Sequence, residues 1–305
     1  MYPPPQRIEA EVFAKLPAEL DRSGQPAPWA KQQLMGQEVG SFLEGPSFDR
    51  DGNLYVVDIA FGRVFRVSPD GAFETVADYD GWPNGLKIHS DGRIFIADHM
   101  HGIMTLDPAT GAVEPFLVRP KLESFKGVND LVFAANGDLY FTDQGQTGLH
   151  DPTGRVYRLT ADGRLDLLLD NVPSPNGLVL SPEEDLLFLA VTRANAIWRL
   201  PLLPDGTTTK VGLFVQLSGG GGPDGLAMDQ DGNLAVAHFG LGSVWLFSRF
   251  GEPLYRIVSP AGRFTTNVAY GGPERRHLYI TESRTGSILR AELPVPGRTM
   301  YSHMD

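Results

Sequence analysis

Cysteine is absent from this chain of 305 residues. The protein therefore has no disulfide, no thiolate metal site and no cysteine nucleophile. The motifs Gly-x-Ser-x-Gly and Gly-x-x-x-x-Gly-Lys-Ser/Thr are missing too, which argues against a serine-hydrolase elbow and a phosphate-binding P-loop. No apolar run approaches the length of a membrane span, and residues 1–7 lack the apolar core of a signal peptide. We therefore expect a cytoplasmic protein without a membrane partner.

Positive charge is also scarce. The chain has 26 Lys and Arg residues against 37 Asp and Glu residues, a formal net charge of −11. This balance argues against nucleic acid as a partner, because phosphate backbones are bound by basic surfaces. It is compatible with a small-molecule substrate and with a bound cation. The oligomeric state cannot be inferred from the composition.

A short motif recurs along the chain. Its clearest copies are Trp82-Pro83-Asn84-Gly85-Leu86, Ser174-Pro175-Asn176-Gly177-Leu178 and Gly222-Pro223-Asp224-Gly225-Leu226. Three looser copies complete a set that aligns one polar residue six times: Glu44, Asn84, Asn129, Asn176, Asp224 and Asn267. The steps between them are 40, 45, 47, 48 and 43 residues. Repeats of this length indicate a β-propeller or another array.

Each repeat also reads as a series of short strands. An apolar run follows the marker residue, then a turn, then a second strand. Four of the six turns contain Asp-Gly or Asn-Gly, which predicts hairpins with type I′ turns. A third strand usually starts at a glycine, and a fourth follows another turn. Four antiparallel strands repeated six times predict an all-β, six-bladed β-propeller.

We interpret residues 1–305 as one domain, with six repeats over residues 44–292. A propeller must close its ring, and the partly alternating segment at residues 8–14 can supply a strand. We therefore expect the N-terminal segment, residues 1–43, to close the last blade. Residues 17–35 are irregular and predict a loop or a short helix.

This topology predicts where the chemistry lies. Each marker residue stands where the chain enters an innermost strand, so the six markers should surround one mouth of the central channel. The second strand returns to the same end, which brings Asp143, His238 and the neighbouring His99 toward that mouth. We expect these three residues and Asn84 to contact substrate.

The ring offers carboxylate and amide oxygens, the ligands of a hard cation such as Ca²⁺. Any single marker is better explained as a turn residue whose side chain bonds nearby backbone. Six equivalent positions, two of them carboxylates, favour a site for one divalent cation. We expect Ca²⁺ first, with Mn²⁺, Mg²⁺ or Zn²⁺ as alternatives.

The ordered motifs resemble the senescence marker protein-30/gluconolactonase family, which includes regucalcin and lactonases. The resemblance rests on segments spread across the repeat region: Glu44-Gly45-Pro46, Val128-Asn129-Asp130-Leu131, Tyr140-Phe141-Thr142-Asp143, Pro175-Asn176-Gly177-Leu178, Pro223-Asp224-Gly225-Leu226 and residues 266–272. It implies a six-bladed propeller with one catalytic divalent cation. The metal ligands implied by the resemblance are Glu44, Asn129, Asn176 and Asp224. Asp224 also matches the carboxylate that acts as base or nucleophile.

The expected function is a metal-dependent hydrolase that opens a lactone, with water attacking a carbonyl polarised by the cation. One alternative keeps the site and changes the reaction, to phosphotriester hydrolysis or another metal-dependent step. A second alternative is a non-catalytic propeller in which the cation only ties the blades together. The sequence does not identify the physiological substrate or decide whether Asp224 acts as base or nucleophile.

Overall fold

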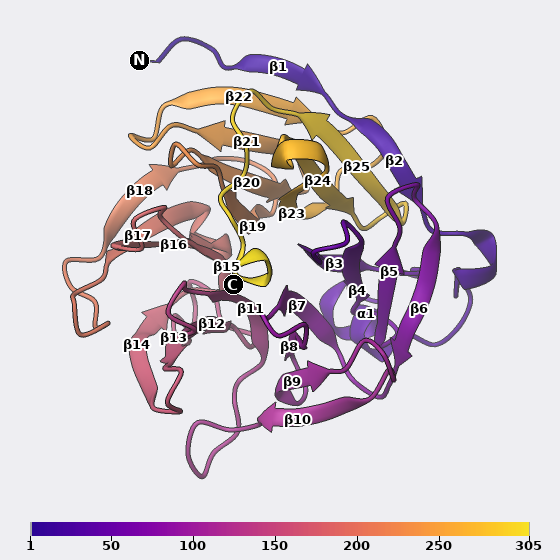
Figure 1. The fold of residues 1–305 in the computed structure, drawn as a ribbon, viewed down its shortest axis with the longest axis horizontal. Helices are drawn as coiled ribbons and strands as arrows, with labels where there is room; N and C mark the ends of the chain where they lie inside the picture. Colours follow the sequence, from indigo (N-terminus) through magenta and orange to yellow (C-terminus); the bar gives the residue numbers. More distant parts are fainter. Residues whose placement is uncertain (1, 305) are drawn as a thin grey trace.

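The computed structural model describes residues 2–304 and consists of six sheets arranged around a central axis (Figure 1). The predicted six-bladed β-propeller is therefore confirmed. No helix within residues 2–304 is long and apolar enough to cross a membrane.

The strands follow one another through the blades in chain order. Blades one to three comprise β3 (Leu43–Phe48), β4 (Leu54–Asp58), β5 (Arg63–Val67) and β6 (Phe73–Asp78); β7 (Pro83–Ile88), β8 (Ile94–Asp98), β9 (Gly102–Leu106) and β10 (Val113–Leu117); and β11 (Val128–Phe133), β12 (Leu139–Asp143), β13 (Gly154–Leu159) and β14 (Leu165–Val172). Blades four to six comprise β15 (Pro175–Leu180), β16 (Leu186–Val191), β17 (Ala196–Pro201) and β18 (Gly212–Gln216); β19 (Gly222–Met228), β20 (Leu234–Phe239), β21 (Ser243–Phe247) and β22 (Pro253–Val258); and β23 (Thr265–Gly271), β24 (His277–Glu282) and β25 (Ser287–Glu292).

The N-terminal segment joins two neighbouring blades. β2 (Glu11–Lys15) pairs antiparallel with β25 and is the outermost strand of the sixth blade, the position that we expected residues 8–14 to fill. That segment is not one strand, however. β1 (Gln6–Glu9) pairs in parallel with β22 of the fifth blade, and the buried Ala10 lies between the two strands. The N-terminus therefore ties blade five to blade six (Figure 1).

The hairpin turns differ in detail from the prediction. Gly52, Gly92, Gly137 and Gly232 have φ between 81° and 91°, whereas the Asp or Asn before each is not among the described residues with positive φ. In the first turn, Gly52 N–H donates to Asp49 O and Asp49 N–H donates to Asn53 O. The loops are type I turns followed by a left-handed glycine and a bulge, a common alternative to the type I′ turn.

The hydrophobic core is divided among the interfaces between blades. Six clusters each combine side chains of two adjacent blades; for example, Val56 and Phe65 of blade one pack with Ala269 and Tyr279 of blade six. Fully burying one such side chain contributes roughly 1.5–3 kcal/mol. A seventh cluster forms around α1 (Pro28–Gln33), where Trp29 and Ala30 are buried. This helix lies in the stretch that was predicted to be a loop or short helix.

Four 3₁₀ turns complete the structure. Their bounds are η1 (Ala18–Leu20), η2 (Thr192–Ala194), η3 (Pro273–Arg275) and η4 (Tyr301–His303).

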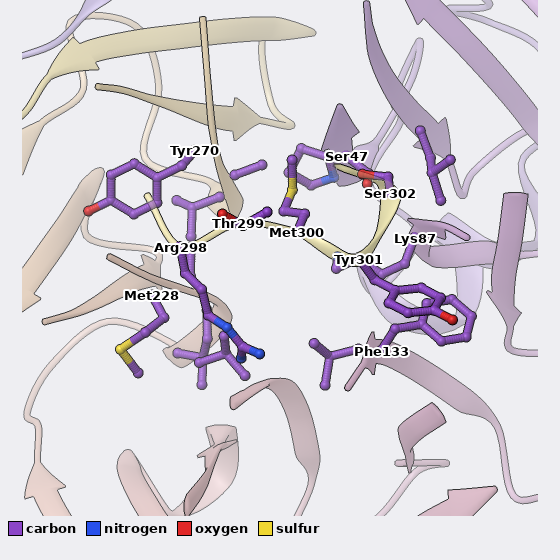
Figure 2. A pocket seen from close by; sticks show the side chains of 18 of the residues that line it. Ser47, Lys87, Phe133, Met228, Tyr270, Arg298, Thr299, Met300, Tyr301 and Ser302 are labelled. Carbon is purple, nitrogen blue, oxygen red and sulfur yellow. The ribbon is translucent and has the colours of Figure 1, made fainter. Parts of the chain in front are cut away.

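The C-terminal strap, residues 297–304, crosses one mouth of the channel (Figures 1 and 2). It contacts every blade. Ser302 Oγ donates to Phe48 O of blade one, and the Tyr301 ring packs against His89 of blade two and Phe133 of blade three. Arg298 Nη1 donates to Leu180 O of blade four, and Arg298 N–H donates to Met228 O of blade five. Gly297 N–H donates to Arg275 O of blade six. A cavity of only about 80 Å³ remains between the strap and the inner strands. The strap therefore closes this mouth and joins the blades a second time.

Tyr301 anchors the strap through stacking at 5.1 Å on Phe133 and an edge contact at 4.9 Å with His89. We expect Tyr301→Ala to lower the stability by about 2 kcal/mol, because a half-buried ring and two aromatic contacts are lost. Thermal melting of both proteins in the same buffer measures this. Tyr301→Phe, which keeps the aromatic ring, should have a Tm close to that of the wild type. If Tyr301→Ala also had an unchanged Tm, the strap would not stabilise the propeller.

Candidate metal and catalytic site

The six marker residues occupy equivalent places on the innermost strands. In every blade the pairing of the first strand with the second shifts register at or beside the marker, as between Glu44 and Ser47 and between Pro223 and Leu226. Such irregularities bend a strand and redirect its side chains. The repeated bulge therefore turns the markers toward the channel axis.

Glycine after the marker lets neighbouring inner strands approach each other. A Cβ on Gly45, where φ is +56°, would lie 2.5 Å from Asn84 O, and one on Gly225 would lie 2.0 Å from Asn267 Oδ1. No side chain fits at these positions. The Asn-Gly and Asp-Gly pairs thus have a packing role in addition to any role in a turn.

A cavity of about 590 Å³ opens at the mouth opposite the strap. The four expected ligands, Glu44, Asn129, Asn176 and Asp224, all line it. Their exposed fractions lie between 4% and 9%, so they form a buried floor. The structure thus brings together the four residues on which the resemblance placed a metal ion.

Within residues 2–304, two acids on this floor form no ion pair with a Lys or Arg side chain. Burial raises the pKa of Glu44 to about 7, against hydrogen bonds from Asn267 Nδ2 and Gly45 N–H, each at 3.0 Å. Burial and then the negative charges of Glu44 and Asp130 raise the pKa of Asp224 well above its ordinary value, although Asn176 hydrogen-bonds to this carboxylate. Both shifts have the same cause, which is negative charge held away from water.

Asp130 is a third buried acid at the axis, and the sequence reasoning did not select it. It follows Asn129 and stands where the clearest copies of the motif have glycine. Its carboxylate lies 3.9 Å from Lys87 Nζ and 3.5 Å from Asn267 Nδ2. Burial raises the pKa of Asp130, and Lys87 opposes the shift. The departure from glycine in this copy was the signal available in the sequence.

The amides of the floor differ in their bonding. Asn129 Nδ2 donates to Gln144 Oε1 at 3.0 Å, whereas Asn129 Oδ1 is one of the few buried side-chain atoms in residues 2–304 without a hydrogen-bond partner. Asn267 is occupied by Glu44 and by the backbone N–H of Val268. Asn129 therefore has a free oxygen for a ligand, while the side chain of Asn267 supports its neighbours.

These donors fit a hard divalent cation. Residues 2–304 hold no group of three or more His, Asp or Glu side chains placed for a metal ion. The expected set has a different composition, with two carboxylates and two amides. Such a cation would neutralise the two buried carboxylates, whose pKa values are raised, and would give the unpartnered amide oxygen a ligand bond.

Two of the expected substrate contacts line the cavity. Asn84 is half-buried on β7, and His99 follows β8. The His99 ring lies 6.0 Å from the Trp82 ring, and burial lowers the pKa of His99. A neutral imidazole at the wall can accept or donate one proton.

Asp143 and His238 do not line the cavity. Asp143 is fully buried and accepts hydrogen bonds from Gly127 N–H and Arg155 Nε, both at 2.8 Å. His238 contacts Gly219 O and accepts from Trp245 Nε1 at 3.2 Å. Asp58 and Glu282 hold the backbone N–H of Phe42 and Phe264 in the same way. These side chains at the ends of the second strands fasten the loops above the floor, and we leave Asp143 and His238 out of the proposed substrate contacts.

The cavity walls include residues that the sequence reasoning did not select. Arg193, on η2, is the one Lys or Arg side chain among the lining residues, and its charge partly offsets the raised pKa of Asp224. Gln144 bridges Asn129 and Ser174, and Trp29 and Leu34 come from the α1 segment. None of them belongs to the repeated motif.

Comparison with known proteins gives consistent results. Residues 42–284 match the family model described as the SMP-30/Gluconolactonase/LRE-like region. The chain is 31% identical over 245 residues to the lactonase drp35 of Staphylococcus aureus, which covers 76% of this chain and 73% of that protein.

Two solved structures share the fold. A calcium-binding regucalcin of Agrobacterium tumefaciens superposes with a TM-score of 0.78 and 23% identity over 97% of this chain and 98% of that one. A gluconolactonase of Xanthomonas campestris gives 0.75 and 23% over 96% and 99%.

The buried acids should make the metal-free protein sensitive to pH. Asp224 has a higher pKa in the folded chain than in the unfolded chain, so stability falls as the pH rises from about 4 toward the folded value. Asp224→Asn removes this loss. In chelator-treated protein at pH 8, we expect the variant to be more stable than the wild type by at least about 1 kcal/mol, or roughly 2 °C in Tm. At pH 5 the difference should shrink.

Asp58→Asn is the matched control, because it leaves the buried guanidinium of Arg63 without its carboxylate partner. It should lower Tm at both pH values. If Asp224→Asn were less stable than the wild type at pH 8, the Asp224 carboxylate would not be destabilising in the metal-free protein, and the hypothesis would be wrong.

Proposed function

The chain belongs to the SMP-30/gluconolactonase/LRE-like family, and from this premise we propose that it is a metal-dependent lactonase acting at the floor of the cavity. The lactonase and gluconolactonase relatives support a hydrolase that acts on a small molecule. The observation that carries the proposal is the pair of buried carboxylates, Glu44 and Asp224, beside the free amide oxygen of Asn129.

Glu44, Asn129, Asn176 and Asp224 would hold the cation. Their oxygens suit Ca²⁺, and Mn²⁺ or Mg²⁺ accept the same donors. When bound, the cation supplies Lewis acidity for the lactone carbonyl oxygen.

Asp224 acts as the base in the proposed reaction. Its carboxylate orients a water molecule and takes one proton as the water oxygen bonds to the carbonyl carbon. The ring C–O bond then breaks, and the proton passes to the leaving oxygen, which yields a hydroxy acid. The hydrogen bond from Asn176 restricts the rotation of the Asp224 carboxylate and so helps to orient the water molecule.

Asn84 and His99 lie where they can contact the substrate. The amide of Asn84 can donate to a ring or carbonyl oxygen. His99, kept neutral by the burial that lowers its pKa, can relay the proton to the leaving oxygen. Arg193 provides a positive charge at the wall for the carboxylate that the reaction creates.

The proposal is tested with a panel of γ- and δ-lactones and one phosphotriester, using chelator-stripped protein with and without Ca²⁺, Mn²⁺, Mg²⁺ or Zn²⁺. We expect lactone turnover that requires a metal. We expect Asp224→Asn to lower kcat by at least about 100-fold, because the base is lost. Glu114→Gln, which alters an exposed acid on β10 outside the cavity, should keep kcat.

If only the phosphotriester were hydrolysed, the proposed reaction would be wrong and the proposed site would stand. A rise in Tm with Ca²⁺ and no turnover of any substrate would leave a propeller in which the cation is only structural.

Metal binding can be measured without catalysis. Saturating Ca²⁺ should raise the Tm of the wild type, because the ion binds only the folded chain. Asn129→Ala removes the unpartnered oxygen and should reduce this rise by weakening Ca²⁺ binding about tenfold or more. Asn136→Ala, which truncates an exposed amide outside the cavity, serves as the comparison at matched Ca²⁺ concentrations. An undiminished rise in Asn129→Ala would exclude Asn129 as a ligand.

A further inference from the structure

The cavity above the acids has two chemically different sides. Over blades two, three and four its wall is mostly polar and includes His99, Gln144 and Arg193, with Leu149 as an apolar exception. Over blades five and one the wall is mostly apolar: Gln33 is its polar member, beside Trp29, Leu34, Phe42, Ile59 and Phe239. Because blades five, six and one are consecutive in the ring, these apolar side chains occupy one sector.

The apolar sector is a continuous packed wall. The Trp29 ring lies 4.7 Å from the Phe42 ring, and Phe239 lies 4.5 Å from Phe264, which in turn contacts Phe42 at 6.5 Å. Trp29, Phe42 and Ile59 are buried within the same cluster, and Leu34 packs against it. The wall is therefore built before any substrate arrives.

Part of the polar side is already committed to internal bonds. Gln144 Nε2 donates to Ser174 Oγ at 3.0 Å, and Thr147 Oγ1 donates to Gln144 O at 2.6 Å. Thr192 Oγ1 donates to Pro223 O. These groups therefore have fewer free hydrogen-bond donors and acceptors for a polyhydroxylated lactone than their number suggests.

The α1 segment lies outside the part of the chain that matches the family model. That match covers residues 42–284, whereas α1 and Leu34 span residues 28–34. Trp29, Gln33 and Leu34 nevertheless line the same cavity as Asp224. The segment thus adds apolar surface to the reaction cavity from outside the shared region.

We propose that residues 28–34 form a specificity wall and that the substrate is a lactone with an apolar substituent on its ring. This inference rests on the proposed lactonase function. The carbonyl lies over the acids, and the substituent packs against Leu34 and the aromatic rings. Its burial favours the alkyl-substituted lactone over an unsubstituted or a polyhydroxylated one, because apolar surface leaves water.

The test compares γ-butyrolactone, a γ-lactone with a six-carbon chain, and glucono-δ-lactone. The wild type should have a kcat/KM for the alkyl lactone at least about tenfold above that for glucono-δ-lactone. Leu34→Gln, which is similar in size but polar, should lower kcat/KM for the alkyl lactone about tenfold, mainly through KM. The same variant should leave γ-butyrolactone within about twofold, because that substrate has no chain to bury.

Two further variants sharpen the result. Gln33→Leu extends the apolar wall and should raise kcat/KM for the alkyl lactone several-fold. Met35→Gln is the matched control, since Met35 is 90% exposed and does not line the cavity. It should change none of the three values.

A binding measurement separates the two proposals. Non-hydrolysable lactams replace the lactones, and their effect on Tm is recorded for the wild type and for Leu34→Gln. The alkyl lactam should stabilise the wild type more than the unsubstituted lactam does, and Leu34→Gln should lose that difference. Equal effects of the two lactams, or a preference for glucono-δ-lactone that Leu34→Gln leaves unchanged, would overturn the specificity wall. Failure to hydrolyse any lactone, with the lactam preference intact, would overturn the lactonase proposal and keep the apolar subsite.

Discussion

The burial of three carboxylates near the channel axis is the dominant constraint on this structure. Glu44, Asp130 and Asp224 converge near the channel axis, and one ammonium group, that of Lys87, approaches Asp130 at 3.9 Å. Close-packed inner strands keep water from these acids, and their pKa values rise as a result. Such an arrangement costs stability, and a fold retains it where ligand binding repays the cost. The large interfaces between blades supply the stability that the axis lacks.

The rigidity of the floor depends on side chains that never reach the cavity. Asp58, Asp143 and Glu282 end their second strands and accept a backbone N–H from the loop that leads into the inner strand. Arg63 and Arg155 neutralise two of these acids. The chain thus uses its acidic residues in two ways. Acids at the ends of the second strands fasten loops, and Glu44 and Asp224 on the inner strands line the cavity.

Much of the fold and of the floor could be predicted, because both repeat. Six marker residues at steps of 40 to 48 residues require a closed ring, and a ring brings equivalent positions to one mouth. Position alone could not separate Asn84, which lines the cavity, from Asp143, which is paired with Arg155. Asp130 was missed because it departs from the repeated glycine, and the type of hairpin turn was wrong because Asp-Gly suits more than one turn. The α1 segment and the strap do not repeat, so periodicity carries no information about where they pack.

The two ends of the chain make the channel one-sided. The C-terminal strap closes one mouth, and α1 narrows the other without covering the acids. With the strap in place, the described residues leave the cavity beside α1 as the way for a small molecule to reach Glu44 and Asp224. The residues that close this mouth also join the blades to one another, so loosening the strap would open the channel and weaken the contacts between blades together.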